Sequence, residues 1–283
     1  MKRILIVGSG DIARRMIPRL AKSCRVHALV RNPEYCNALR NLGAIPVMGD
    51  LDDRKSLSRI SSNADSVLHL APPEQQGSID ARTRNLLAVL SGTVRKLVYV
   101  STSGVYGDCG GEEVSETRPL RSTSMRSRLR ADAERQIRAW ARRNGAHACI
   151  LRVPGIYAKD RLPIERLKQG MPCIVDNEDS YTNHIHADDL AGIIIAALNH
   201  GSPCRIYHAS DDSGLRMGQY FDMVADAFGL PRPPRLPRLE VKNAVSPMMY
   251  SFMSESRRLS NLRMKRELKI RLIYPTVADF LAG

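Results

Sequence analysis

The chain has 283 residues, 43% of them hydrophobic, and carries a formal net charge of +14. This hydrophobic content is enough to build a core and excludes a chain that stays disordered. The first apolar run, ILIV, is too short for a secretory signal, and no later run approaches the roughly 18 residues of a membrane span. We therefore expect a soluble, cytoplasmic protein without membrane contact.

The positive charge favours anionic partners, such as nucleotides and phosphorylated small molecules. Aromatic residues make up only 5% of the chain and no nucleic-acid motif is present, which argues against nucleic acid as a partner. The six cysteines are scattered without any Cys-x-x-Cys pair, so we expect reduced thiols and no metal site.

Short β-branched runs alternate with amphipathic segments in the first half of the chain. We expect strands at 3–7, 25–30, 44–48, 65–70, 96–101 and 148–153. Helical patterns lie between them, at 11–22, 33–42, 53–61, 80–93 and 123–144. Continuous apolar strands separated by helices predict an α/β fold with a doubly wound, Rossmann-like parallel sheet, which binds ligands at the carboxyl ends of its strands.

This regularity fades after Tyr157. We expect a dinucleotide-binding domain over 1–158, to which 184–210 returns with one more strand at 204–209. Segments 159–183 and 211–283, with many prolines and helical patterns in the tail, are expected to form a smaller, mainly helical substrate-binding unit over the edge of the sheet.

The opening KRILIVGSGDIARRM places Gly8, Gly10 and Ala13 at a turn from a strand to a helix. Glycines permit the tight turn and let backbone N–H groups approach a pyrophosphate, and the helix N-terminus adds positive charge. A small third residue lets the helix pack close to the strand. We predict a dinucleotide site formed by Gly8, Ser9, Gly10, Asp11 and Ile12.

The ends of the next strands are expected to hold the rest of the dinucleotide. Arg31 and Asn32 stand where a site specific for NAD usually has an acidic residue, and an arginine can neutralise a 2′-phosphate. NADP is therefore the preferred cofactor and NAD the alternative. Residues expected at the adenine edge and along the ribose and pyrophosphate path are Asp50, Leu51, Leu70, Ala71 and Pro72.

These residues, with KLVYVSTSGVYGD, ILRVPGIY, NHIHADDLA and KRELKIRLIYPTVADFL, resemble an atypical, extended short-chain dehydrogenase/reductase of the NAD-dependent epimerase/dehydratase type. The G-x-G-x-x-A turn departs from the family's usual G-x-x-G-x-x-G. The resemblance implies an NAD(P)-binding oxidoreductase or epimerase-like enzyme that acts on an anionic or nucleotide-linked substrate. It also allows a homodimer, to which the helix at 80–93 would contribute.

The active families begin the helix after their fifth strand with a Tyr-x-x-x-Lys pair. Aligning SRLRADAE with the family pattern puts Ser124 at the Tyr position and Arg128 at the Lys position, where Arg128 would contact the cofactor ribose. A serine hydroxyl is far less acidic than a phenol, so the usual proton donor is missing. Thr102 matches the substrate-polarising Ser/Thr, and Pro154, followed by Gly155, matches a loop at the nicotinamide end.

Other residues offer alternatives that the sequence leaves open. Tyr106, Tyr157, His184 and His186 are candidate substitute acids, and histidine is chemically the best of them. Two further pairs complete the set, namely Asp188 and Asp189, expected to cap the next helix, and Arg257 and Arg258, which would bind a substrate phosphate. The lost tyrosine also supports a different class of function, a non-catalytic NADP(H)-binding sensor or assembly factor.

Overall fold

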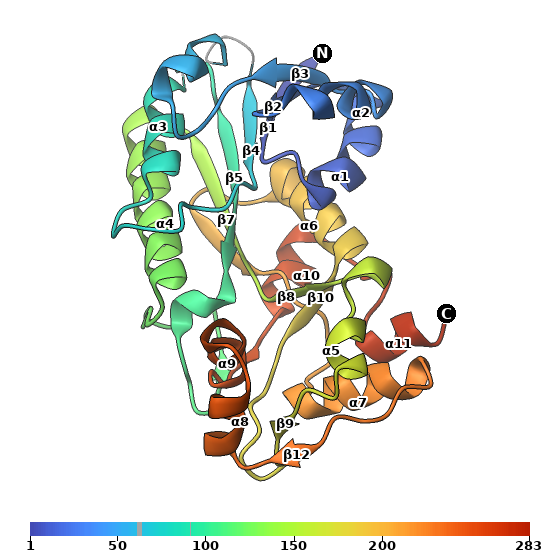
Figure 1. Cartoon of the computed structure of the whole chain (residues 1–283). Helices are drawn as coiled ribbons and strands as arrows, with labels where there is room; N and C mark the ends of the chain where they lie inside the picture. Colours follow the sequence, from blue (N-terminus) through green and yellow to red (C-terminus); the bar gives the residue numbers. More distant parts are fainter. Residues whose placement is uncertain (61–63, 91) are drawn as a thin grey trace.

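The computed structural model describes residues 1–60, 64–90 and 92–283 (Figure 1). Seven parallel strands form a central sheet in the order β11-β7-β5-β4-β1-β2-β3. The strands are β1 (Lys2–Val7), β2 (Cys24–Val30), β3 (Ile45–Met48), β4 (Ser66–His69), β5 (Lys96–Thr102), β7 (His147–Val153) and β11 (Arg205–His208). The predicted doubly wound sheet is confirmed, because each observed strand lies within one residue of its predicted range at either end.

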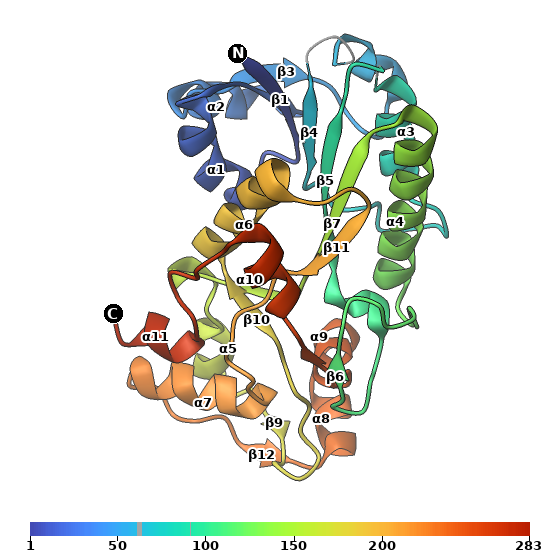
Figure 2. The same ribbon diagram turned by 180° about the vertical axis from the view of Figure 1, so that it is seen from behind.

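Helices cover both faces of this sheet (Figures 1 and 2). On one face lie α1 (Asp11–Ala21), α2 (Cys36–Asn41) and α6 (Ala187–His200), and on the other lie α3 (Ala81–Val89) and α4 (Met125–Asn144). The strand centres are mostly apolar because alternate residues face opposite cores. In β1, Ile4 and Ile6 pack on the α1 and α6 side, whereas Leu5 and Val7 pack on the α3 and α4 side.

Two predicted helices differ in detail from the structure. The segment predicted as a helix at 53–61 is a short 3₁₀-helix, η2 (Arg54–Arg59), and the segment at 33–42 opens with a 3₁₀ turn, η1 (Pro33–Tyr35). Residues 61 and 91, within the predicted helices 53–61 and 80–93, lie outside the described residues.

A smaller, mainly helical part lies beyond the carboxyl ends of the strands (Figure 1). Its elements are α5 (Ile164–Lys168), β9 (Cys173–Ile174), α7 (Met217–Ala227), β12 (Arg235–Leu236), α8 (Arg238–Ala244), α9 (Pro247–Met253) and α11 (Val277–Leu281). They share their own hydrophobic core, which includes Leu167, Phe221 and Met253. This part reaches the sheet through the short strands β8 (Gly155–Tyr157) and β10 (His184–His186), which pair in parallel.

Part of the C-terminal segment packs against the central sheet and not in the smaller part. Helix α10 (Leu262–Leu268) packs on α6 and β11, and its Met264 and Leu268 are buried in the core beside the sheet (Figure 2). Just before it, β13 (Arg258–Leu259) pairs with β6 (Glu113–Val114), which follows the turn η3 (Ser103–Tyr106). The domain boundaries at 158, 184 and 210 stay predictions.

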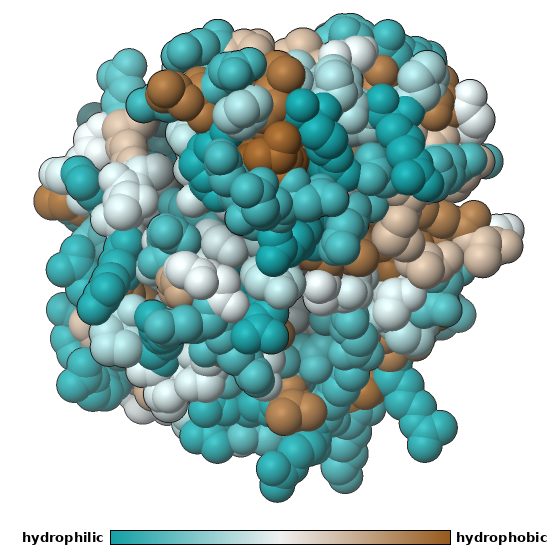
Figure 3. All heavy atoms as spheres, turned by 90° about the horizontal axis from the view of Figure 1, so that it is seen from below, coloured by the Kyte–Doolittle hydropathy of each residue, from teal (hydrophilic) through white to brown (hydrophobic). Residues whose placement is uncertain are grey.

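The surface agrees with the charged composition. Seen from the end that carries the smaller part, it is mostly hydrophilic, with hydrophobic side chains in small groups (Figure 3). Leu239 of α8 and Met248 of α9 are among the most exposed large hydrophobic residues. Among the described residues, no helix combines the length and the hydropathy that crossing a membrane requires.

Candidate functional site

A cleft of about 1770 Å³ lies at the carboxyl ends of β1, β2, β4, β5 and β7. Gly8, Arg31, Ala71, Thr102 and Pro154 follow or end these strands, and all of them line the cleft. The strand order reverses between β1 and β4, so the cleft lies at the switch point where doubly wound sheets bind their ligands.

The turn after β1 has the geometry of a phosphate cradle. Gly8 has a φ of +101°, and a Cβ on it would come within 2.5 Å of the backbone nitrogen of Ala71. Gly10 is the N-cap of α1, and a Cβ there would meet no heavy atom within 4 Å. The first N–H groups of a helix have no intrahelical partner. A diphosphate therefore fits against the open side of Gly10, at the positive end of α1.

Asp11 places a carboxylate in the first turn of α1. Without a counter-charge, this carboxylate would repel a phosphate bound at the turn. Its oxygens pair with Arg15 at 3.0 Å and with Arg161 at 3.1 Å. These two arginines balance the carboxylate, and the N–H groups of the turn keep their attraction for an anion.

The far end of the cleft combines basic and aromatic side chains. Arg31 is exposed directly after β2, and the guanidinium of Arg14 lies over the ring of Tyr35, 5.4 Å from its centre. Arg82 and Asp52 form an ion pair at 2.6 Å, and the hydrogen bond from Arg82 lowers the pKa of Asp52. All five of these residues line the cleft, and only Arg31 among them was predicted from the sequence.

Most of the predicted dinucleotide residues come together in this one cleft. Those that line it are Gly8, Ser9, Gly10, Asp11, Arg31, Asn32, Asp50, Leu51, Ala71, Pro72 and Pro154. Ile12 and Leu70 are placed differently, because their side chains pack against the core on the α1 side of the sheet. Contacts from the backbone of Ile12 and Leu70 to a bound cofactor stay predictions, and so do the roles of the residues that line the cleft.

The predicted pair on α4 does not line the cleft. Ser124 is the N-cap of the helix, and its Oγ accepts a hydrogen bond from the Ser127 N–H at 3.2 Å. Arg128 is exposed, and its Nε donates to the Ser122 carbonyl at 3.5 Å. These placements do not fit the prediction that Ser124 and Arg128 stand for the family's tyrosine and lysine.

Arg126 and Arg130 lie on the face of α4 that borders the cleft instead. They form one stripe with Glu134, because side chains four residues apart share a helix face. Glu134 is buried, accepts a hydrogen bond from Ser101 of β5 at 2.7 Å and is anchored by Arg152 of β7 at 2.7 Å. The sequence does not show that Glu134 is buried, so it gave no signal that would have identified both arginines.

Thr102 ends β5 and lines the same part of the cleft. Its Oγ1 accepts a hydrogen bond from the Gly104 N–H at 3.2 Å. A hydroxyl that accepts in this way keeps its own proton to donate. The geometry is therefore suited to a hydrogen bond from Thr102 to an oxygen of a ligand.

The four candidate substitute acids are all buried, and none is among the residues that line the cleft. Burial raises the pKa of Tyr106 to about 12, and its hydroxyl oxygen is 2.6 Å from both an Arg152 nitrogen and His208 Nε2. Burial also raises the pKa of Tyr157 and lowers the pKa values of His184, to about 3, and His186.

The two aspartates expected to cap α6 form other contacts instead. His186 is the N-cap, and its Nδ1 accepts from the Asp188 N–H at 3.2 Å. The Asp188 side chain pairs with Arg15 at 2.7 Å. Asp189 accepts from the N–H groups of Ile273 and Tyr274, at 2.7 and 3.0 Å. The capping prediction was wrong because a histidine ring reaches the helix end first, and Asp189 anchors the tail.

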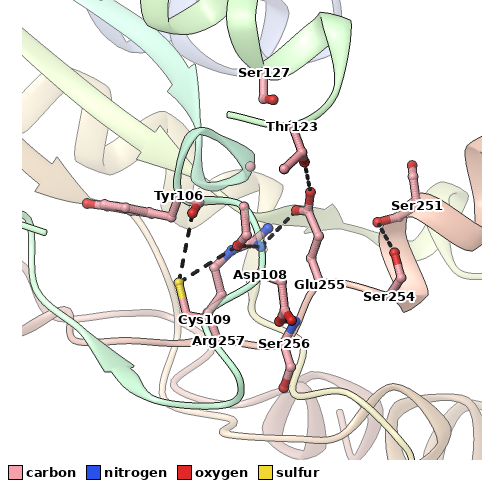
Figure 4. Close-up of polar contacts among 12 residues, drawn as sticks. Tyr106, Asp108, Cys109, Thr123, Ser127, Ser251, Ser254, Glu255, Ser256 and Arg257 are labelled. Carbon is pink, nitrogen blue, oxygen red and sulfur yellow. Dashed lines mark hydrogen bonds and ion pairs between the residues drawn. The ribbon is translucent and has the colours of Figure 1, made fainter. Parts of the chain in front are cut away.

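The two arginines expected to bind a substrate phosphate are engaged within the protein. Arg257 Nη1 donates to Glu255 and to the Gly107 carbonyl, both at 2.8 Å, and Figure 4 shows its side chain beside Glu255. Arg258 Nε donates to the Gly111 carbonyl at 2.9 Å, and its guanidinium lies over Tyr181. Both arginines thereby tie the tail to the segment after η3.

Comparisons with known proteins agree with this architecture. A sequence model described as the NAD dependent epimerase/dehydratase family matches residues 4–209. The chain is 24% identical to a 4-hydroxy-2-methyl-3-oxo-4-farnesyl-3,4-dihydroquinoline-1-oxide ketoreductase of Stigmatella aurantiaca, over 81% of this chain and 74% of that protein. The structure of a conserved protein of unknown function from Silicibacter pomeroyi DSS is 29% identical, with a TM-score of 0.82 over 99% of this chain and 97% of that one. The dTDP-glucose 4,6-dehydratase of Bacillus anthracis, solved in complex with NAD, has a TM-score of 0.79 at 16% identity, over 99% and 94% of the two chains.

Proposed function

The chain belongs to the NAD dependent epimerase/dehydratase family, and from this premise we propose that it is an NADP(H)-binding oxidoreductase acting on an anionic or nucleotide-linked substrate. The observation that carries the proposal is the turn after β1. Gly8 leaves no room for a side chain against Ala71, while Gly10 is open on the side where a diphosphate would lie. The cofactor would extend across the switch point from Arg31 to Thr102.

The preference for NADP rests on charge at the end of β2. Arg31 is exposed there and lines the cleft, and Arg14 stands nearby with its guanidinium over Tyr35. Guanidinium groups bind phosphate oxygens well, because their N–H groups form a planar fork. The 2′-phosphate of NADP would meet Arg31, whereas the free hydroxyl of NAD would leave this charge unused.

A bound nicotinamide would supply or accept a hydride at the end of the cleft near Thr102. Thr102 would donate a hydrogen bond to the substrate oxygen that changes between carbonyl and alcohol. Arg126 and Arg130 add positive charge along the same wall, and this charge stabilises an oxygen that becomes more negative. A protonated guanidinium does not titrate near neutral pH, so the proton would be exchanged with water in the open cleft.

Calorimetry with NADPH and NADH tests the cofactor, and a turnover screen tests the chemistry. We expect NADPH to bind more tightly than NADH. The screen should cover nucleotide-sugars and small carbonyl compounds with both cofactors. Heat from neither dinucleotide would refute the proposal, and binding without any turnover would favour the second candidate.

The second candidate is a non-catalytic NADP(H) sensor or assembly factor. It is favoured by the placement of Tyr106, Tyr157, His184 and His186, which are buried and do not line the cleft. Affinity purification with and without NADPH distinguishes the two candidates. A sensor should change its bound partners when the dinucleotide is added, whereas an enzyme need not.

A further inference from the structure

The first turns of α4 direct two arginines toward the reacting end of the cleft. Arg126 and Arg130 are one helical turn apart and line the cleft together with Met125, Thr102 and Pro154. The orientation of this helix face is fixed by Glu134, one turn further along α4, which contacts Arg152 of β7 and Ser101 of β5 in the buried interior. The buried pair therefore fixes the helix face that carries both arginines; Arg130 is half-buried, and the exposed Arg126 extends from this face over the ring of Phe252.

Neither guanidinium forms an ion pair with a carboxylate in the described part of the chain. Arg130 Nη1 donates to neutral groups, the Val100 carbonyl at 2.6 Å and the Tyr99 hydroxyl at 3.2 Å. The Arg126 guanidinium lies over the ring of Phe252 in α9, 4.9 Å from its centre. By contrast, Arg82 in the same cleft is paired with Asp52. The wall beside Thr102 thus carries two guanidinium groups without a direct carboxylate partner among the described residues. Glu255, which is paired with Arg257, acts on Arg126 only through its charge.

The charge of Arg130 also acts on Arg126 itself. Burial, and after it the charge of Arg130, lowers the pKa of Arg126. Two like charges held one turn apart repel each other. An anion bound between or beside them would relieve this repulsion and would gain charge-assisted hydrogen bonds.

The remote arginines offer no comparable site. Arg257 is taken by Glu255 and the Gly107 carbonyl, and Arg258 by the Gly111 carbonyl and the ring of Tyr181. A long substrate whose diphosphate reached Arg257 or Arg258 would have to break these contacts. A short substrate with its negative charge next to the reacting carbon would meet Arg126 and Thr102 directly.

We propose that Arg126, assisted by Arg130, binds the anionic group of the substrate beside the reacting carbon, and that the substrate is a small carbonyl or alcohol bearing a carboxylate or a phosphate. This inference rests on the proposed function and narrows its substrate class. Arg126 holds the substrate by charge on a helix that has a serine, Ser124, at the aligned tyrosine position. The protein would therefore prefer substrates that carry a negative charge over neutral ones, whereas a tyrosine at this site would not require that charge.

The test is a set of calorimetric titrations of the full chain at about 0.15 M ionic strength, with and without NADPH. The probes are oxalate for the carboxylate, inorganic phosphate for the phosphate, and UDP-glucose for a long substrate. The variants are Arg126→Gln and Arg126→Lys, with Arg128→Gln as the matched control. Arg128→Gln removes the same charge from the same helix, but Arg128 is exposed and lies outside the lining of the cleft.

We expect oxalate or phosphate to bind the wild type, and the probe that binds identifies the anionic group. Arg126→Gln should weaken this binding by about tenfold or more, Arg126→Lys should restore part of it, and Arg128→Gln should leave it unchanged. NADPH should still bind all variants, with Arg128→Gln equal to the wild type. Equal anion affinity in Arg126→Gln and Arg128→Gln, or binding of UDP-glucose alone, would overturn the inference. Failure of NADPH to bind refutes the proposed function instead, and the titrations without cofactor still decide whether Arg126 binds an anion.

Discussion

Arg152 and Glu134 form a doubly hydrogen-bonded ion pair inside the protein. Arg152 Nε lies 3.1 Å from Glu134 Oε1 and Nη2 lies 2.7 Å from Oε2, and each side chain is only 2% exposed. The pair joins β7 to α4, and the Tyr106 hydroxyl lies 2.6 Å from the third guanidinium nitrogen. Because the pair fixes how α4 is rotated, it also determines which side chains of its first turns face the cleft.

Replacing Glu134 by glutamine should destabilise the protein strongly. The change leaves the charge of Arg152 buried without its counter-charge, which typically costs about 3–5 kcal/mol. Urea unfolding measures the loss. The control is Asp65→Asn in the pair with Arg3, whose side chains are each 39% exposed, where we expect less than about 1 kcal/mol. Equal losses in the two variants would contradict a structural role for the buried pair.

The contact between Arg152 and Glu134 also explains why the orientation of α4 could not be predicted from the sequence. The strands were predictable, because most of them have centres that are buried on both faces and read as short apolar runs, whereas the edge strand β3 is only partly buried. The cofactor turn was predictable too, since Gly8 and Gly10 are adjacent to β1. The rotation of α4 was not, because it depends on a contact between Glu134 and Arg152, which are 18 residues apart and look like two ordinary surface charges. Ser124 and Arg128 were preferred as a result, two positions away from the arginines that line the cleft.

The two glycines of the first turn should fail in different ways. Gly8→Ala should destabilise the fold by about 1–3 kcal/mol, because alanine disfavours a positive φ and its Cβ would meet the Ala71 backbone at 2.5 Å. Gly10→Val should keep the fold, since its Cβ meets open space and φ is −75°, but it should lose NADPH binding. Thermal unfolding without ligand and calorimetry with NADPH separate the two effects. A Gly10→Val protein that binds NADPH normally would show that the diphosphate lies elsewhere.

Reversing the charge of Arg31 should change the choice of cofactor. In Arg31→Glu we expect the affinity for NADPH to fall by about tenfold or more, because a charge-assisted hydrogen bond to the 2′-phosphate is lost and repulsion is added. The affinity for NADH should change little. Arg40→Glu is the control, since Arg40 is exposed on α2 and does not line the cleft. Parallel losses for both dinucleotides would mean that Arg31 contacts a group common to them.

A buried carboxyl at the end of β11 should make stability depend on pH. Burial raises the pKa of Asp211 to about 7, although the Ser213 N–H, which donates to Oδ1 at 3.1 Å, and the Tyr157 hydroxyl act against this shift. The ordinary value is about 3.9, so between these two pH values the folded protein holds a proton that the unfolded chain has lost. The contribution of Asp211 is therefore fully present below about pH 4, falls as the pH rises and is lost above about pH 7.

The comparison of wild type with Asp211→Asn isolates this contribution. Three buried histidines, His69, His184 and His208, have pKa values lowered to about 3 by burial and act in the opposite direction, but they are common to both proteins and cancel in the difference. The free energy of unfolding of the wild type, relative to Asp211→Asn, should fall by up to about 4 kcal/mol between roughly pH 4 and pH 7. A constant difference between wild type and Asp211→Asn, measured by urea unfolding across this range, would show that Asp211 is ionised in the folded protein throughout.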